Sequence, residues 1–440
     1  MSGTLLCVDD MFTYYSVRNQ ERQILGCNGH VWYKPGMSQR GLVIHQGALG
    51  DVVLSFPALA SFQRQQDVRL TLLCARQTGR MAQDLGLVDC YCSTESRQAS
   101  YLFQRHWRSE ASRFFGDFDL IIFIGYSQTV VAGLRNNFGG SIYWVPPRPD
   151  ITDPCHVARH VMKGFEKEGL LSVSRGTAGV ASSHVVPRLS APAVDFGRKG
   201  ELCVLHVGSG SDRKRWNTER FVTMAREIQV KGMGPAVFLI GPAEEGLITF
   251  LKKESGRCGR LMVLDPDRFP GRAGQTGMDR ANTYFYLPTR DLREVISLLK
   301  RTRFFVGNDS GLTHLAAYLG VPTIALFGPS SPSRWAPVGD HVTVLRGAVN
   351  CEPCFETSSR NCDDPRCLTG ISTEMVLAAL EGELSLPAMD SVRASIPPNP
   401  PLVEFAGGSR RWARRRTRVL QVPTNTEDPV KSASPKGHKN

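Results

Sequence analysis

The stretch that decides the fold is FFVGNDSGLTHLAAYLGVPTIALFGPSSPSRWAP, residues 304–337. Apolar runs and polar loops alternate along it. Phe304–Val306 predicts a strand, and His314–Leu319 predicts a short helix that a glycine and a proline end. Thr323–Phe327 predicts the next strand, after which a Gly-Pro pair turns the chain. The stretch therefore predicts a strand, a polar loop, a helix and a second strand.

The polar loop, residues 307–313, lies between the first predicted strand and the N-terminus of the predicted helix. Free backbone N–H groups and the positive end of the helix dipole make such a place a ready site for an anion. An ordinary strand-loop-helix unit with a capping aspartate is the alternative. In the functional interpretation, the ligand is surrounded by Asp309, Ser310, Gly311, Thr313 and His314.

Four short motifs occur in order along this stretch. They are Asp309-Ser310-Gly311, His314-Leu315-Ala316-Ala317, Gly320-Val321-Pro322 and Phe327-Gly328-Pro329. In this order they resemble glycosyltransferase family 9, which includes the ADP-heptose:lipopolysaccharide heptosyltransferases of Gram-negative bacteria. Four ordered elements are a far more specific signal than one glycine-rich loop.

The same alternation of strand, loop and helix extends over most of the chain, which at 440 residues is long enough for two or three domains. Near-continuous apolar strands that alternate with helices indicate buried parallel sheets. The predicted strands are 41–44, 68–74, 119–125 and 142–147 in the first half, then 203–208, 236–242, 304–306 and 323–327. We therefore predict an α/β protein with two doubly wound parallel-sheet domains facing a cleft, the architecture called GT-B in the resembling family.

Four segments follow from this pattern. Residues 1–37 show neither clear periodicity nor a turn-bounded strand, so we expect an extension outside the fold. Residues 38–185 are expected to form an acceptor-side domain and residues 198–385 a nucleotide-sugar-binding domain. Residues 386–440 are rich in proline and then in arginine, which predicts a disordered basic tail.

The charge is concentrated in that tail. Residues 391–440 carry ten Lys or Arg and three Asp or Glu, which is +7 of the net charge of +12. Such a segment could bind anionic lipid headgroups, bind nucleic acid nonspecifically, or remain a solvated tail. The nucleic-acid interpretation depends on the tail alone, so we do not favour it.

No apolar run approaches the ~20 residues that span a bilayer, and no charged start followed by an apolar core is visible at the N-terminus. We therefore expect a cytoplasmic protein, associated at most peripherally with the inner membrane. In that compartment the 12 cysteines are expected to be thiols or metal ligands rather than disulfides.

The first loop of the chain's α/β pattern runs from His45 to Leu59. Gly47 and Gly50 allow a tight turn after the strand, and Asp51 opens an apolar helix. From spacing alone, Asp51 suits an N-cap or a first-turn acid. The family resemblance implies instead that Asp51 is the general base that deprotonates the acceptor hydroxyl.

The loop 206–216 opens the second half with small residues followed by Arg-Lys-Arg. Small residues such as Ser209 expose backbone N–H groups, and Lys214 offers a point charge for phosphate, although a solvated basic loop is the alternative. The resemblance implies that Lys214 contacts the donor pyrophosphate. Glu244 or Glu245, after another predicted strand, could accept hydrogen bonds from ribose hydroxyls or be an exposed first-turn acid.

A cysteine cluster follows the second half of the decisive stretch, with the spacing C-x2-C-x7-C-x4-C. Such spacing in a reducing compartment indicates a structural zinc or iron site, and a disulfide or plain thiols are the alternatives. No histidine stands beside these thiols, so we do not expect a catalytic role for them. The residues are Cys351, Cys354, Cys362 and Cys367.

The resemblance implies transfer of a heptose from ADP-heptose to an inner-core sugar of a lipopolysaccharide precursor. Asp9-Asp10 lies outside the expected fold and Asp363-Asp364 lies between cysteines, so neither acid pair follows a predicted strand and we expect no catalytic cofactor. Lys214, the N–H groups of residues 310–313 and a helix dipole would stabilise the leaving diphosphate instead. Two alternatives stay open: transfer to a hydroxyl of a protein such as an autotransporter, raised by the cysteine cluster, and a non-catalytic nucleotide-sugar-binding protein.

Overall fold

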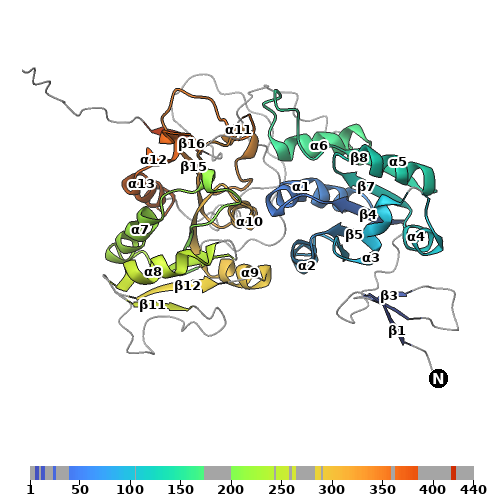
Figure 1. Cartoon of the computed structure of the whole chain (residues 1–440), viewed down its shortest axis with the longest axis horizontal. Helices are drawn as coiled ribbons and strands as arrows, with labels where there is room; N and C mark the ends of the chain where they lie inside the picture. Colours follow the sequence, from blue (N-terminus) through green and yellow to red (C-terminus); the bar gives the residue numbers. More distant parts are fainter. Residues whose placement is uncertain are drawn as a thin grey trace, which may run out of the picture.

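Two α/β domains make up most of the computed structural model, and they lie side by side (Figure 1). The structure describes residues 5–8, 11–14, 23–25, 39–104, 106–172, 200–241, 244–256, 260–263, 283–288, 291–357, 362–384 and 418–422. The first domain is blue to teal in Figure 1, and the second is green to orange.

The first domain contains a five-stranded sheet in the order β6-β5-β4-β7-β8, with every neighbouring pair parallel. Its strands are β4 (Gln39–His45), β5 (Val68–Cys74), β6 (Cys90–Ser93), β7 (Leu120–Ile124) and β8 (Ser141–Val145). Its helices are α1 (Leu49–Gln65), α2 (Arg76–Asp84), α3 (Arg97–Ser100), α4 (Ser109–Phe115), α5 (Gln128–Asn137) and α6 (Val157–Lys167).

The second domain contains an eight-stranded parallel sheet in the order β11-β12-β10-β9-β13-β14-β15-β16. Its strands are β9 (Leu202–His206), β10 (Ala236–Ile240), β11 (Arg260–Val263), β12 (Thr283–Pro288), β13 (Thr302–Asn308), β14 (Thr323–Leu326), β15 (Val342–Gly347) and β16 (Arg418–Val422). Its helices are α7 (Thr218–Val230), α8 (Leu247–Gly256), α9 (Leu292–Lys300), α10 (Gly311–Tyr318), α11 (Pro332–Trp335), α12 (Arg366–Thr369) and α13 (Thr373–Leu384).

The strand order creates one switch point in each sheet. β4 lies beside β7, and β9 lies beside β13, while the chain leaves these neighbours toward opposite edges of the sheet. In open parallel sheets, the loops diverge at such a point and leave a crevice at the carboxyl ends of the strands. The loops after β4, β9 and β13 are among those for which the sequence predicts function.

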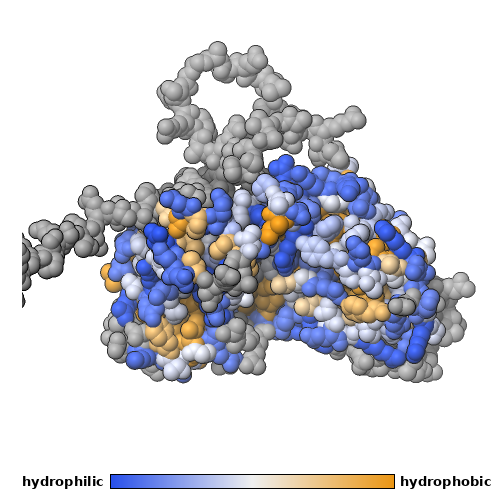
Figure 2. Space-filling view, turned by 45° about the horizontal axis from the view of Figure 1, so that its top comes forward, coloured by the Kyte–Doolittle hydropathy of each residue, from blue (hydrophilic) through white to orange (hydrophobic). Residues whose placement is uncertain are grey.

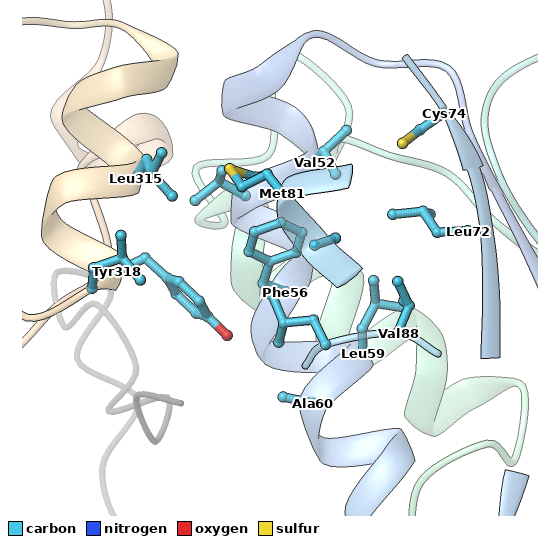
Figure 3. Packing of buried hydrophobic residues seen from close by; sticks show 14 of the residues in the cluster. Val52, Phe56, Leu59, Ala60, Leu72, Cys74, Met81, Val88, Leu315 and Tyr318 are labelled. Carbon is cyan, nitrogen blue, oxygen red and sulfur yellow. The ribbon is translucent and has the colours of Figure 1, made fainter. Parts of the chain in front are cut away.

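The two domains share a hydrophobic core where α1 meets α10. The Phe56 ring of α1 lies 5.3 Å, centroid to centroid, from the Tyr318 ring of α10. Figure 3 shows Leu315 and Tyr318 of α10 facing Val52 and Phe56 of α1. Apolar burial of this kind stabilises by about 25 cal/mol per Å². The domains are therefore joined by core packing as well as by polar contacts.

Glycines allow the N-terminal ends of these two helices to approach closely. A Cβ atom at Gly311 would lie 3.0 Å from the backbone nitrogen of Gly50 and 2.9 Å from Cβ of Leu49. A Cβ atom at Gly50 would lie 3.2 Å from Cδ2 of His314. Any larger residue at these positions would push the two helix ends apart.

Two terminal segments differ from expectation where they are described. Leu5–Val8, Met11–Tyr14 and Gln23–Leu25 form β1, β2 and β3 of a separate antiparallel sheet, although the sequence of residues 1–37 shows no clear strand signal. Arg418–Val422 pairs with β15, so the expectation of disorder is wrong for these five residues. The β-branched and apolar RVLQV sequence suits the otherwise unpaired edge of β15. The rest of the expected tail lies outside the described residues.

The visible faces of both domains are mostly hydrophilic, with hydrophobic residues in separate patches (Figure 2). Within the described part of the chain, no helix combines the length and apolar character needed to cross a membrane.

Three buried histidines predict how stability depends on pH. Burial lowers the pKa values of His45, His156 and His206 from 6.5 to about 4. These rings stay neutral in the folded protein but take up protons near pH 6.5 once unfolded. Unfolding therefore binds protons between pH 6.5 and pH 4, and the stability present above this window is lost as the pH falls through it.

We expect the free energy of unfolding to fall by about 1.4 kcal/mol per pH unit for each such histidine, as measured by urea titration at pH 7 to 4.5. His156→Asn keeps a capping side chain at α6 and should reduce this slope by one proton. His106→Asn, at an exposed position, should not. Equal slopes for both variants would contradict the assignment.

Candidate functional site

A buried ion pair joins the loops after β9 and β13. Nζ of Lys214 lies 2.8 Å from Oδ2 of Asp309, and the two side chains are 19% and 5% exposed. Because β9 and β13 are adjacent parallel strands, their following loops meet at the switch point of the sheet. The structure thus brings together two residues that the sequence predicts for the donor site from segments about a hundred positions apart.

Asp309 is held as a carboxylate. Burial by itself would raise its pKa, but the His314 ring and the Lys214 ammonium outweigh burial and hold the pKa of Asp309 well below its usual range. Nε2 of His314 lies 3.7 Å from Oδ1 of Asp309, while Nδ1 of this buried ring has no hydrogen-bond partner. The charges around Asp309 are therefore fixed, and one ring nitrogen of His314 is buried without a hydrogen-bond partner among the described residues.

The N-terminus of α10 is capped by its own loop. Oγ of Ser310 accepts a hydrogen bond from the backbone N–H of Thr313 at 3.3 Å, and Oγ1 of Thr313 donates to the carbonyl of Asn308 at 2.6 Å. Oγ of Ser209 donates to the carbonyl of Asp309 at 3.0 Å. Ser209, Ser310 and Thr313 therefore fix the shape of the loops, and the backbone of Gly311 lies against α1.

Asn308 is a residue that sequence reasoning missed. Its Nδ2 donates to the carbonyls of Val207 and Gly208 at 3.0 and 3.2 Å, and its Oδ1 accepts from the backbone N–H of Trp216 at 2.8 Å. One fully buried amide thus holds both ends of the loop that carries Lys214. The only signal in the sequence is a polar residue at the end of an apolar strand. Trp216 is 1% exposed and packs in the core.

The structure separates the two candidate glutamates after β10. Glu244 is buried; it accepts from the backbone N–H of Gly241 at 3.1 Å and lies 3.4 Å from Nη2 of Arg215. Glu245 is exposed at the surface. Glu244 therefore contacts the loop that carries Lys214, whereas Glu245 lies two residues before α8 and outside its first turn.

Asp51 lies in the first turn of α1 and forms a two-pronged pair with Arg148, which follows β8. Nη2 of Arg148 donates to Oδ2 of Asp51 at 2.9 Å, and Nε donates to Oδ1 at 3.2 Å. The carboxylate is buried and the guanidinium is 42% exposed. Sequence reasoning missed Arg148, because 97 positions separate the partners. The loop before Asp51 is tightened by a hydrogen bond from the Gly47 N–H to Nδ1 of His45 at 3.1 Å.

Contacts across the domains bring this carboxylate toward the loops after β9 and β13. Gly50, next to Asp51 in the chain, lies against His314, which in turn lies beside Asp309. The guanidinium of Arg148 lies 5.0 Å from the ring centroid of Trp335 in the second domain. Two carboxylates, each paired with one cation, thus border the same interdomain region from opposite sides.

A second arginine that the sequence did not indicate holds the domains together. Arg334 of α11 is 5% exposed and donates to the carbonyls of Asp150, Asp153 and Pro149 in the first domain. Its Nε also donates to Oε2 of Glu356 at 2.9 Å. Nearby, Nε2 of His156 lies 2.8 Å from the carbonyl of Ala336. These bonds fix the loop after β8, which also carries Arg148.

The four cysteines of the predicted cluster line one cavity of about 510 Å³ behind the Lys214 loop. All four are free thiols, and burial raises the pKa of Cys367, with the other three thiols adding to the rise. Within the described ranges, no three Cys, His, Asp or Glu side chains are close enough together to hold a metal ion. As arranged here, the thiols share a cavity but do not form a ligand set.

Comparison with known proteins gives a sequence match within the second domain. The sequence model described as glycosyltransferase family 9 (heptosyltransferase) matches residues 274–363. Lipopolysaccharide heptosyltransferase 1 of Pseudomonas aeruginosa is 30% identical over 129 residues, which cover 26% of this chain and 36% of that protein. The matched segments span between 16% and 51% of the lengths of the curated relatives.

Solved structures match over both domains. A family-9 glycosyltransferase from Veillonella parvula is 19% identical with a TM-score of 0.57, covering 79% of this chain and 97% of that one. The E. coli heptosyltransferase WaaC with ADP is 17% identical with a TM-score of 0.52, covering 78% and 99%. These likenesses confirm the predicted fold, two parallel-sheet domains of the GT-B type. This chain is therefore similar to glycosyltransferase family 9 in sequence over residues 274–363 and similar to solved members of that family in fold over both domains.

Proposed function

We propose that this protein is a glycosyltransferase that moves a heptose from ADP-heptose to an inner-core sugar of a lipopolysaccharide precursor. The observation that carries the proposal is the buried Lys214–Asp309 pair at the switch point of the second sheet. It stands beside the capped N-terminus of α10, and the Asp51 end of α1 faces it from the other domain. The similarity to lipopolysaccharide heptosyltransferase 1 of Pseudomonas aeruginosa, and to the E. coli heptosyltransferase WaaC with ADP, supports the choice of donor.

Lys214 is proposed to hold the diphosphate of the donor. Its ammonium already pairs with Asp309, so a bound diphosphate would form a second ion pair with the same ammonium. The diphosphate would also accept hydrogen bonds from backbone N–H groups at the N-terminus of α10. Charge developing on the leaving diphosphate would then be stabilised by groups that are fixed before the reaction. Buried Glu244 is the group proposed to accept hydrogen bonds from ribose.

Asp51 is proposed as the general base. Arg148 keeps the carboxylate oriented through two hydrogen bonds, and the half-exposed guanidinium leaves room for an acceptor to approach. For proton transfer, the acceptor hydroxyl must replace one of these bonds at the carboxylate. The proton then goes to Asp51 while the hydroxyl oxygen attacks the sugar carbon and the bond to ADP breaks.

Lys214→Ala should weaken ADP binding at least about tenfold in calorimetric titration, because a charge-assisted contact contributes about 1.5–3 kcal/mol. Lys231→Ala, which removes an exposed lysine paired with Glu381, is the matched control and should bind ADP like the wild type. UDP binding in place of ADP would point to another donor. Binding of neither nucleotide would favour a protein without this activity.

Asp51→Asn should keep the fold and ADP binding but reduce transfer at least ~10²-fold, because the amide cannot take the proton. Heptose transfer is measured with a lipopolysaccharide precursor and, in parallel, with a protein acceptor. Transfer to the protein alone would move the proposal to the alternative acceptor. Unchanged turnover in the variant would rule out Asp51 as the base and would favour a different group.

Transfer should be insensitive to EDTA, because Lys214 and the α10 N–H groups are proposed to do what a metal does in other glycosyltransferases. Activity that is lost on chelation and restored by Mg²⁺ or Mn²⁺ would contradict this. Metal bound by Cys351, Cys354, Cys362 and Cys367 stays a separate prediction. Elemental analysis of anaerobically purified protein decides it, and absence of zinc and iron would end it.

We also propose that the protein works peripherally on the cytoplasmic face of the inner membrane, where a lipid-linked acceptor is found. The basic run that would contact anionic lipids is 410–418, and all of it except Arg418 of β16 lies outside the described residues.

A further inference from the structure

Two consecutive residues of the loop between β15 and α12 contact different parts of the candidate site. Phe355 contacts Lys214, and Glu356 contacts Arg334. We propose that Phe355 and Glu356 are positioning residues that couple Lys214 of the donor site to Arg334 of the domain interface. The coupling would make donor binding and the contact between the domains depend on each other. The part that concerns the donor rests on the proposed function, whereas the contact itself does not.

The first half of the argument is the neighbourhood of Lys214. Its ammonium lies 4.1 Å from the centroid of the Phe355 ring and 2.8 Å from Oδ2 of Asp309. The adjacent Arg213 lies 5.4 Å from the same ring and also approaches the carbonyl of Cys354 at 3.5 Å. A cation over an aromatic face is attracted by the ring quadrupole, and more strongly when water is excluded. Phe355 therefore defines one side of the position that Lys214 occupies.

The second half is the partner of Glu356. Its carboxylate receives two bonds from the buried guanidinium of Arg334, at 2.9 and 3.4 Å. The remaining N–H groups of Arg334 reach carbonyls of the loop 149–153 in the other domain. A buried guanidinium that loses its only carboxylate partner among these contacts becomes strongly unfavourable. Glu356 is thus needed for the hydrogen bonds that Arg334 forms with the first domain.

The backbone links the two contacts directly. Phe355 and Glu356 are consecutive, so their Cα atoms are separated by about 3.8 Å and neither residue can shift alone. The segment is held against the β14–α11 turn because the Phe355 N–H donates to the carbonyl of Pro329 at 2.9 Å. Buried Arg346 donates to the carbonyls of Gly328 and Cys351 at 3.0 and 3.4 Å and secures the same turn.

The contacts of Arg334 also connect this loop to Arg148 and Asp51 of the first domain. The loop 149–153 held by Arg334 directly follows Arg148, which pairs with Asp51. Trp335, next to Arg334, carries the cation–aromatic contact with Arg148. A substitution of Phe355 should therefore alter the contacts of Arg334 with the first domain, and a substitution of Glu356 should alter the position of Lys214.

The test measures each change at the opposite end. Phe355→Leu keeps apolar bulk without an aromatic face, and Phe355→Trp keeps the face. Glu356→Gln removes the charge that Arg334 needs, and Glu352→Gln removes an exposed acid of the same loop as a control. For each full-length variant, ADP affinity is measured by calorimetry and backbone hydrogen exchange is measured for residues 149–158. Exchange in α5, at the far side of the first domain, reports global loosening.

We expect Phe355→Leu to weaken ADP binding about fivefold and to speed exchange in residues 149–158 but not in α5. Glu356→Gln should do the same, although it does not touch Lys214, and the retained charge in Glu356→Asp should restore part of the effect. Phe355→Trp and Glu352→Gln should behave like the wild type.

Wild-type ADP affinity in Glu356→Gln, or unchanged exchange at 149–158 in Phe355→Leu, would overturn the coupling. If the wild type binds no ADP, the proposed donor fails, but the exchange comparison still supports or overturns the link between Phe355 and the domain interface.

Discussion

A buried carboxylate governs the arrangement of this protein. Asp309 is almost completely enclosed and remains ionised, which is tolerable only because Lys214 and His314 lie beside it. That requirement ties the loop after β9 to the loop after β13. It also brings His314 of α10 against Gly50 of α1, so the second domain's charged centre lies at the boundary with the first.

The interface between the domains combines tight packing with buried polar contacts. Glycines at the helix ends and the Phe56–Tyr318 contact bring α1 and α10 together. Arg334 adds bonds to backbone carbonyls, which are strongly directional. An apolar interface alone would allow sliding. Buried N–H groups that must be satisfied restrict the interface to one arrangement, and this keeps the Asp51 carboxylate opposite the loops after β9 and β13.

The cysteine-rich loop has more than one connection to this region. Its thiols line a cavity behind the Lys214 loop, while Phe355 contacts Lys214 and Glu356 contacts Arg334. This loop can couple ligand binding to the domain interface, because it contacts the charged groups of both Lys214 and Arg334. The cysteine spacing is the local signal of this loop in the sequence, but two of the seven residues between the second and third cysteines, Phe355 and Glu356, make the contacts with Lys214 and Arg334.

The sequence by itself determined the α/β class, the two-domain division and the loops that carry the candidate site. Apolar strands, Gly-rich loops and the Asp309 motif are local signals, and each reflects the backbone geometry of a few neighbouring residues. Only the tertiary structure decided the contacts between distant residues. Asp51 pairs with Arg148, the Lys214 loop is held by Asn308, and Glu356 pairs with Arg334. The structure also decided that Glu244, and not Glu245, is buried beside Arg215. These pairings join elements far apart in the chain, and their geometry depends on which strand ends become neighbours, which no local pattern encodes.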